Sequence, residues 1–451
     1  MNEIPKHWST STISEVVDIN VRPKRDELDD DTLASFVPMK CVEAESGRFE
    51  SPEDKKVGEV KKGYTPMRDG DVIFAKVTPC MENGKAVVVR GLTNGIGFGS
   101  TEFYSLRPKG GLLSDFLFYF IIQQGFRREA ERHMTGAVGL RRVPKNFIAE
   151  HTIPLPPIPE QRRIVARIEE LFSRLDAGVA ALRHAKAQLQ RYRQSVLAAA
   201  VTGQLTQAWR EQHPDTEPAG ELLERILEQR REQWNGRGKY KEPILDLPSD
   251  LPALPKSWTW SASGHLFECI VPNRDKPKSF TGTTPWITLP DFDGRIVIDH
   301  AVNRVGLTSA EIESSRARVV PAGSVIMSCI GRFGLAAVLG RDAVINQQLH
   351  AFLIPEALPA RYFVYCLQAQ KAFMESIATS TTIAYLNKSN CNRVPIALPP
   401  LDEQHQIVAE VEARTTAIDH LEAELDRQIT RSNRLRQSTL SSAFKGRLTP
   451  Q

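Results

Sequence analysis

The longest hydrophobic pattern in the chain is a heptad repeat that occurs twice. In residues 153–206, and again in residues 396–451, apolar positions alternate steps of four and three, which is typical of a helix that packs lengthwise against another helix. The second copy is the poorer one, because Arg414, Gln428 and Ser432 interrupt its apolar positions. Each copy's best available partner is therefore the other copy. The predicted seam residues are Ile164, Ile168, Leu171, Leu175, Leu182, Leu189, Ile407, Val411, Ile418, Leu421, Leu425 and Leu435.

The two copies are an internal duplication. Residues 153–206 align with residues 396–449 at a constant offset of 243, and 22 of the 54 aligned positions are identical. Each copy opens on Leu-Pro-Pro, and Glu160 and Glu403 fall in the first helical turn, where a carboxylate suits the positive end of the helix dipole. Two helices of about 40 residues would pair into a rod about 60 Å long. Their repetition favours a spacer between two like modules in pseudo-two-fold symmetry over two helices that merely close two cores.

The segments that precede the two helices also resemble each other. Lys-X-Trp occurs near the start of each, at residues 6–8 and 256–258. Each then has a turn-to-strand pattern, a further strand and an apolar helix-like stretch, so we predict two α/β modules. The strands are expected at Gly70–Val77 with Phe103–Pro108 and at Gly323–Ile330 with Ala351–Pro355, and the helices at Asp115–Arg132 and Arg361–Ile377.

These patterns divide the chain into five parts. A helix with Leu222, Leu223, Ile226 and Leu227 on one face is expected in the joint between the two repeats, closed by Gly236 and followed by a proline-rich run. The predicted parts are residues 1–152 (first module), 153–206 (first spacer helix), 207–253 (linker with a docking helix), 254–395 (second module) and 396–451 (second spacer helix).

Composition is that of an ordinary globular chain. With 451 residues, 41% hydrophobic and 25% charged, two to four domains are expected. Net charge is only +4, and residues 1–152 hold 22 basic and 22 acidic side chains, so a DNA-binding face would require segregation of charge. The six cysteines form no CxxC pair, which favours a reducing compartment. Without an apolar run of about 18 residues or a signal peptide, we expect a cytoplasmic protein with no membrane partner.

Catalytic motifs are missing from the sequence. There is no GxxxxGK[ST] loop and no HExxH motif. Asn94–Ser100 lacks the GxGxxG order of a dinucleotide loop. Glu53–Lys55 has the spacing of a metal nuclease but no matching carboxylate upstream, and is interpreted as surface charge. The chain is therefore interpreted as non-catalytic, with no catalytic residue, cofactor or metal of its own.

Polar loops at strand ends are the candidate contact surfaces. In the first module, residues 75–87 offer side chains that reach bases and phosphates, and residues 135–143 combine glycines with arginines able to pair with guanine. Residues 328–334 and 380–388 correspond to them in the second module, and residues 346–352 could read adenine. The alternatives are polar hairpins, solvent-exposed turns and satisfied backbone groups. The candidate DNA contacts are Lys76, Thr78, Glu82, Asn83, Lys85, Arg141, Arg142, Ser328, Arg332, Asn346, Gln347, Thr381 and Thr382.

The repeated motifs resemble a known family, the DNA-specificity subunits of type I restriction-modification systems. The resemblance covers essentially the whole chain, and its most specific marks are LPPIPEQRRIVARIEELF with RYRQSVLAAAVTGQLT, and LPPLDEQHQIVAEVE with LRQSTLSSAFKGRLT. It implies an α/β fold in which two target-recognition domains are separated by an antiparallel two-helix coiled coil. Arg414 departs from the apolar pattern of the seam.

The resemblance also implies a function. Each domain would read one half of an asymmetric bipartite site in double-stranded DNA. Two methyltransferase subunits would flank the rod and two restriction-translocase subunits would join them, so that S-adenosylmethionine, ATP and Mg belong to the partners. Two alternatives remain open, a coiled-coil scaffold that joins two proteins without reading DNA and an enzyme with an unrecognised active site.

Overall fold

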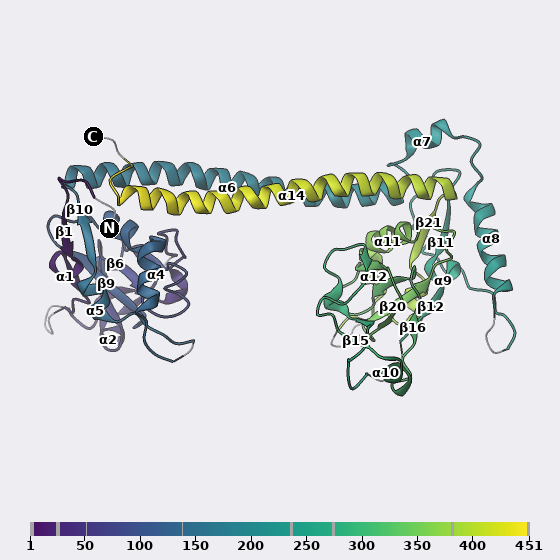
Figure 1. The fold of residues 1–451 in the computed structure, drawn as a ribbon, viewed down its shortest axis with the longest axis horizontal. Helices are drawn as coiled ribbons and strands as arrows, with labels where there is room; N and C mark the ends of the chain where they lie inside the picture. The colour runs from purple at the N-terminus through teal and green to yellow at the C-terminus, as the bar shows by residue number, and fades with distance from the viewer. Residues whose placement is uncertain are drawn as a thin grey trace. The chain divides into compact units, whose positions relative to one another are not determined.

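A computed structural model describes residues 4–23, 28–50, 52–137, 139–234, 238–272, 276–379 and 383–448 (Figure 1). The chain forms two compact units, Met1–His184 with Glu424–Gln451, and Ala185–Ala423. Each unit holds one α/β module and a part of each long helix, α6 (Ile158–Val201) and α14 (Leu401–Ala443). The fold class predicted from the sequence is confirmed, but the compact units do not follow the five linear parts, because the long helices pair in antiparallel order.

The first module contains two four-stranded sheets. Their strand orders are β2-β9-β6-β7 and β4-β3-β8-β5, and β3 runs parallel to β8. The strands are β2 (Val17–Ile19), β3 (Leu33–Val37), β4 (Glu53–Lys56), β5 (Thr65–Arg68), β6 (Val72–Ala75), β7 (Ala86–Val88), β8 (Ile96–Gly99) and β9 (Phe103–Pro108). The helices are α1 (Ile13–Val16), α2 (Val57–Val60), α3 (Ser114–Ile121), α4 (Gln124–Arg132) and α5 (Lys145–Glu150).

The second module repeats this plan with a five-stranded and a four-stranded sheet. Their orders are β12-β20-β17-β18-β14 and β15-β13-β19-β16. The strands are β12 (Glu268–Ile270), β13 (Thr284–Ile287), β14 (Val297–Ile298), β15 (Gly306–Leu307), β16 (Val319–Val320), β17 (Val325–Ser328), β18 (Ala336–Leu339), β19 (Ala343–Ile345) and β20 (Leu349–Leu353). The helices are α9 (Ser263–Leu266), α10 (Ser309–Ser314), α11 (Ala360–Ala369), α12 (Lys371–Ile377) and α13 (Lys388–Asn392).

The predicted strands and helices correspond to observed elements. β6 and β17 confirm the two turn-to-strand patterns, and both are buried along their whole length, because helices cover one face of the sheet and the second sheet covers the other. Each apolar stretch predicted as one helix is broken once, α3 from α4 and α11 from α12. The break lets the second helix of each pair turn away while the first stays on the sheet.

Each long helix directly follows a short two-stranded antiparallel ribbon. β1 (Ser9–Thr12) pairs with β10 (Thr152–Leu155), and β11 (Thr259–Ala262) pairs with β21 (Pro395–Leu398). In both cases the first strand opens the module and the second leads into the helix (Figure 1). The ribbon therefore ties the two ends of a module together at the start of its helix.

A buried glutamine fixes each helix to the turn before it. The Gln161 amide donates to the carbonyls of Pro156 (2.9 Å) and Gly111 (2.8 Å), and its oxygen accepts from the Leu113 N–H at 2.9 Å. The Gln404 amide donates to the Pro399 carbonyl at 2.9 Å. Proline carbonyls at this turn face the interior, and a buried acceptor without a partner costs about 1–3 kcal/mol. The repeated Pro-Pro and Glu-Gln residues are thus explained by structure rather than by catalysis.

Each long helix ends at a glycine that packs against a proline from the start of a module. Gly203 and Gly446 have φ of +77° and +65°, as expected beyond a helix C-terminus. A Cβ at Gly203 would lie 2.5 Å from Pro255, and one at Gly446 would lie 2.2 Å from Pro5. The end of α14 therefore closes onto the start of the first module, as the end of α6 closes onto the second.

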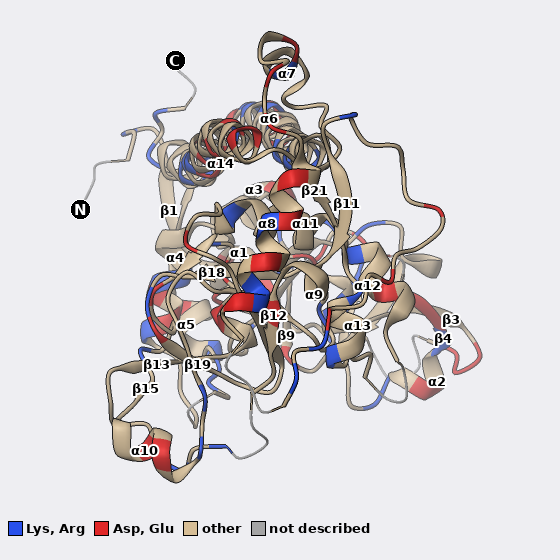
Figure 2. Ribbon diagram, turned by 90° about the vertical axis from the view of Figure 1, so that its right-hand side faces the viewer, with Lys and Arg blue, Asp and Glu red and all other residues tan. Residues whose placement is uncertain are grey.

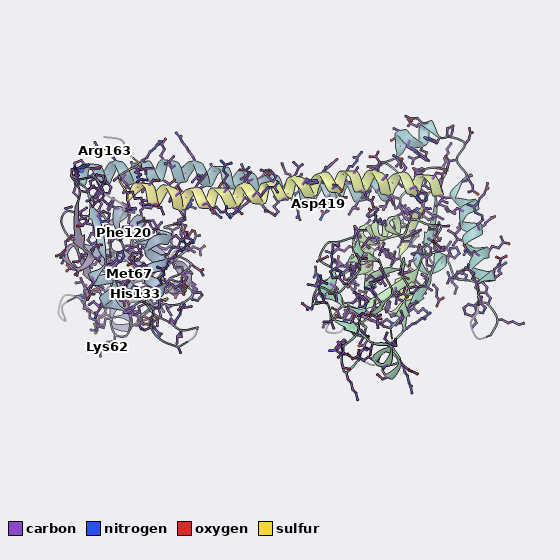
Figure 3. The ribbon with its side chains drawn as sticks, viewed as in Figure 1. Lys62, Met67, Phe120, His133, Arg163 and Asp419 are labelled. Carbon is purple, nitrogen blue, oxygen red and sulfur yellow. The ribbon has the colours of Figure 1, made fainter. Side chains whose placement is uncertain are left out.

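Two ion pairs related by the duplication join α6 to α14. Asp176 pairs with Arg436 in the first unit, and Arg193 pairs in the second with Asp419, which is labelled in Figure 3. The 243-residue offset relates Asp176 to Asp419 and Arg193 to Arg436, so one contact is formed twice. This pairing defines the antiparallel register of the helices.

Burial supports the apolar seam at its ends. Ile164, Ile168, Ile407, Val411 and Ile418 are at most 2% exposed, and the first four also belong to the module cores. The remaining positions are only partly covered, because one neighbouring helix cannot enclose a side chain. The half-buried seam residues are Leu171, Leu175, Leu182, Leu189 and Leu425.

The predicted seam is wrong at Leu421 and Leu435. These side chains are 53% and 47% exposed, whereas their neighbours Glu422 and Arg436 retain only 18% and 17% side-chain exposure. Arg436 lies 4.3 Å from the centre of the Phe172 ring, which adds a cation–π contact to its ion pair. Paired charges with long apolar stems occupy the contact positions, and the leucines face outward.

The joint between the repeats docks on the second module. Helix α7 (Gln207–Gln212) follows α6, and α8 (Ala219–Glu232) buries Ala219, Leu222 and Ile226 among residues of the second core. Leu223 packs at the edge of this core. Acidic and basic side chains alternate on the rest of α8 (Figure 2). The helix expected in this joint corresponds to α8, while Gly236 lies outside the described residues.

We expect Glu403→Ala to destabilise the second unit strongly. Glu403 is fully buried, accepts from Thr206 Oγ1 at 2.7 Å and Trp258 Nε1 at 2.8 Å, and pairs with Arg210. The substitution would leave the partly buried guanidinium of Arg210 without its carboxylate partner, which costs about 3–5 kcal/mol. Hydrogen exchange of the second unit's buried amides would measure the change.

The duplicated residue Glu160 supplies the matched control. It bonds His7 Nε2 at 2.9 Å, and His7 is 40% exposed, so Glu160→Ala should cost about 1–2 kcal/mol in the first unit. Equal losses in the two units would contradict this account of the Glu403 site.

Candidate nucleic-acid interface

The two candidate loops of the first module lie side by side. The Thr78 N–H donates to the Arg141 carbonyl at 3.0 Å, and the Val143 N–H donates to the Lys76 carbonyl at 2.9 Å. Residues 75–87 and 135–143 are separate candidates in the sequence, and the fold brings them together into one surface at the end of β6. Val138 within the second loop lies outside the described residues.

Arg142 is held by an acidic partner. Its Nε and Nη2 donate to the Glu102 carboxylate at 2.9 and 2.7 Å. These bonds hold the pKa of Glu102 below its usual value and raise the pKa of Arg142. Because this fork already has a carboxylate, Arg142 could pair with guanine only after leaving Glu102.

The other candidates of the first module are engaged to different degrees. Thr78 Oγ1 donates to Glu82 Oε1 at 2.9 Å, while Glu82 Oε2 is buried without a partner among the described residues. Lys85 Nζ donates to the Met39 carbonyl at 3.1 Å, and Lys76 Nζ lies 5.1 Å from the Tyr104 ring centre. The side chains most open to a ligand are Asn83, which is exposed, and Arg141, which is 40% exposed and 3.9 Å from Glu82 and 3.8 Å from Glu131.

The second module joins its candidate loops in the same way. The Gly331 N–H donates to the Ala384 carbonyl at 3.0 Å, and the Leu386 N–H donates to the Cys329 carbonyl at 2.8 Å. Arg332 is exposed, and its side chain has no ion pair or hydrogen bond with another described residue. The candidates Thr381 and Thr382 lie outside the described residues.

Ser328 is wrong as a DNA contact. It is fully buried at the end of β17, and its hydroxyl donates to the Ile330 carbonyl at 3.3 Å. Asn346 matches the alternative interpretation, because its Oδ1 accepts from the Gln348 N–H at 3.1 Å and its Nδ2 donates to the Gln348 side chain at 3.0 Å. Gln347, between them, is exposed.

Arg127 positions the first module's loops, and no sequence pattern indicates this role. It is 7% exposed, and its guanidinium donates to the carbonyls of Glu82 (2.6 Å) and Ile122 (3.1 Å) and pairs with Glu45. It therefore ties residues 44–48, the 82–85 turn and the α3–α4 break into one rigid corner.

The weak catalytic motifs are ordinary structure. Asp54 accepts from Thr93 Oγ1 at 2.6 Å, and Lys55 lies 4.3 Å from the Phe36 ring centre. Residues 96–99 form β8 inside a sheet, where a Cβ on Gly99 would lie 2.8 Å from the Val37 carbonyl. The described residues contain no His, Cys, Asp and Glu cluster suited to a metal. Within those residues, no helix is both long and apolar enough to cross a membrane.

The duplicated modules, each with one pair of joined loops, define a protein with two related recognition modules. Comparison with known families agrees with this class. The family described as Type I restriction modification DNA specificity domain matches residues 5–182 and 255–431. The chain therefore belongs to this family, which confirms the resemblance seen in the sequence.

Individual relatives are specificity subunits, and two solved structures share the fold. The chain is 29% identical to the Type I restriction enzyme EcoEI specificity subunit of Escherichia coli, over 94% of this chain and 80% of that protein. It is 32% identical to the EcoAI specificity subunit of Escherichia coli, over 62% and 54% respectively. Among solved structures, a chain from a study of complex assembly and conformational transition of the type I R-M system matches with a TM-score of 0.75 and 21% identity over 99% of both chains. The HsdS subunit of Thermoanaerobacter tengcongensis matches with a TM-score of 0.57, 21% identity and 99% and 98% coverage.

Proposed function

We propose that this chain is the DNA-specificity subunit of a type I restriction-modification system and reads an asymmetric bipartite target in double-stranded DNA. The observation that carries the proposal is the duplicated family match, with one pair of joined loops in each module. Loops that extend from strand ends present side chains to base edges, while the sheets beneath hold them rigidly.

The two halves of the target differ in this proposal because the two loop pairs differ. The first offers Asn83 and Arg141 beside the Arg142–Glu102 pair, and the second offers Arg332, which follows the bridge between Ile330 and Tyr385. Asparagine and arginine favour adenine and guanine respectively in the major groove. Two unlike surfaces of this kind read two unlike half-sites, and a scaffold without a DNA role would not need them.

Catalysis belongs to the partners in this proposal. Two methyltransferase subunits supply methyl transfer from S-adenosylmethionine, and two restriction-translocase subunits supply ATP-dependent translocation and Mg-dependent cleavage, in the cytoplasm. The chain selects the place where those subunits act.

The long helices offer apolar side chains for the methyltransferase subunits. Tyr192 and Leu435 are both 47% exposed and are related by the 243-residue offset, and Leu421 is 53% exposed. Aromatic and aliphatic side chains left outward on a helix pair suit a further helix. Duplicated positions provide two related docking sites, one for each methyltransferase subunit.

Methylation by the purified chain, with and without its methyltransferase subunit, tests this function. We expect no methyl transfer by the chain alone, and methylation of a two-part motif by the complex, mapped by sequencing a methylated plasmid library. Methyl transfer by the isolated chain, or methylation without a two-part motif, would contradict the proposal.

The double variant Tyr192→Glu with Leu435→Glu should reduce assembly of the chain with the methyltransferase subunit. Arg163→Glu, which changes an exposed residue outside these positions, should not.

A further inference from the structure

A polar groove runs between the first module and the long helices of the same unit. One part, of about 590 Å³, lies between the α3–α4 break and α14, and the other, of about 600 Å³, lies between residues 44–48 and both helices. The two parts share Glu45 and Asn433, so they adjoin each other along the helices. All lining residues belong to the first unit.

The lining of the groove is strongly basic. Five guanidinium groups and two carboxylates line it, a net charge of +3 in a chain whose first module is neutral. The two carboxylates are already matched, since Glu45 pairs with Arg127 and Asp176 pairs with Arg436. The excess of positive charge therefore resides on the other three arginines.

These three arginines are Arg48, Arg183 and Arg434. They come from the first module, α6 and α14, and all three are exposed. Their side chains make no hydrogen bond or ion pair with another described residue. Three like charges placed on one groove by three separate elements, without a counter-charge, suit an anionic ligand longer than a single phosphate.

The groove adjoins the candidate reading loops. The Glu45 N–H donates to the Gly84 carbonyl at 3.0 Å, and Ala44 forms a bridge with Lys85. Arg127 joins the 44–48 turn to Glu82. A duplex with base edges against Asn83 would continue past this corner, where its sugar-phosphate backbone meets the groove.

We propose that this groove binds the phosphate backbone of the DNA that flanks the half-site read by the first module. The inference rests on the proposed function and adds the surface that supplies sequence-independent affinity. The guanidinium groups of Arg48, Arg183 and Arg434 each contact a phosphate and displace counterions. Several cations of the candidate loops, residues 75–87 and 135–143, are already bonded within the module. These loops therefore discriminate between bases, and the groove supplies most of the positive charge.

Salt-dependent DNA binding by the assembled methyltransferase complex tests the proposal. The triple variant Arg48→Gln, Arg183→Gln and Arg434→Gln should lower the slope of log K against log salt by about 2–3, since each lost phosphate contact removes about 0.9. Target and non-target duplexes should lose affinity by the same factor, about 100-fold at ~0.1 M salt. The methylated motif should be unchanged.

The matched control replaces Arg128, Arg162 and Arg163 by Gln, three exposed arginines of the same unit outside the groove. It should leave the slope nearly unchanged, and replacing the three groove arginines by Lys should preserve it. A wild-type slope in the Gln variant would overturn the proposal, as would failure of that variant to assemble with the methyltransferase, which would make the groove a protein interface. A wild-type complex that bound DNA without any preferred motif would instead refute the proposed function.

Discussion

Exchange of residues 13–151 for the corresponding segment of another family member is expected to replace one half of the methylated motif completely and to leave the other half unchanged. Both candidate loops of the first module lie within this segment. The junctions preserve β1 and β10, the contact of Pro5 with Gly446 and the whole of α6. The core of the exchanged segment also packs against Ile164, Ile168 and Phe444 of the retained helices, so the donor segment must present apolar side chains to them. Methylome sequencing of the host strain reads the result.

The reciprocal exchange is the control. Exchange of residues 263–394 keeps β11 and β21 and should change the other half alone. Combining both exchanges should give a motif made of the two new halves, separated by the original spacer. Simultaneous change of both halves after a single exchange would show that one module reads the whole site or alters the conformation of the other.

The duplication made the helices and modules predictable. A repeat at constant offset identifies the same element twice, so a weak pattern in one copy is supported by the stronger pattern in the other. The ends of each helix were also readable, because prolines precede α6 and α14 and a glycine with positive φ follows each of them. Local residues determine such boundaries, and no distant contact is needed to recognise them.

The side of the helix that faces its partner was less predictable. Apolar periodicity favoured Leu421 and Leu435, but Glu422 and Arg436 lie at the contact because each is paired across the helices. A different signal was present in the sequence. Aspartate and arginine occur at equivalent positions in both copies, at residues 176 and 193 and at residues 419 and 436. Charge complementarity between the copies would have given the register that hydrophobicity alone did not.

The candidate contact residues were the least predictable part. Whether an arginine is available depends on partners far away in the chain, such as Glu102 for Arg142. Ser328 looked like a loop residue because it follows an apolar run, yet it is still within the strand. The groove arginines come from three separate elements, so sequence proximity could not group them. Burial and pairing, which decide these cases, arise only when the chain has folded.

Inserting one heptad into each long helix, after His184 in α6 and after Arg427 in α14, is expected to lengthen the spacer between the half-sites by one to three base pairs. The sites correspond at the 243-residue offset and lie between the two ion pairs, so Asp176–Arg436 and Arg193–Asp419 remain paired. Seven residues add about 10 Å at about 1.5 Å each, and DNA rises about 3.4 Å per base pair. The upper limit is therefore about three.

The helical rotation of DNA opposes a spacer increase of the full three base pairs. Seven residues are two turns of a coiled-coil helix, so the modules keep their setting about the helices, whereas three base pairs turn DNA by roughly 100° at about 10.5 per turn. A compromise between length and rotation gives the expected range, while both half-site sequences stay the same because no loop is altered. A heptad inserted in α6 alone would misalign Asp176 or Arg193 with its partner, and that variant should lose methylation. An unchanged spacer in a fully active double insertion would show that the helices do not set the distance between the half-sites.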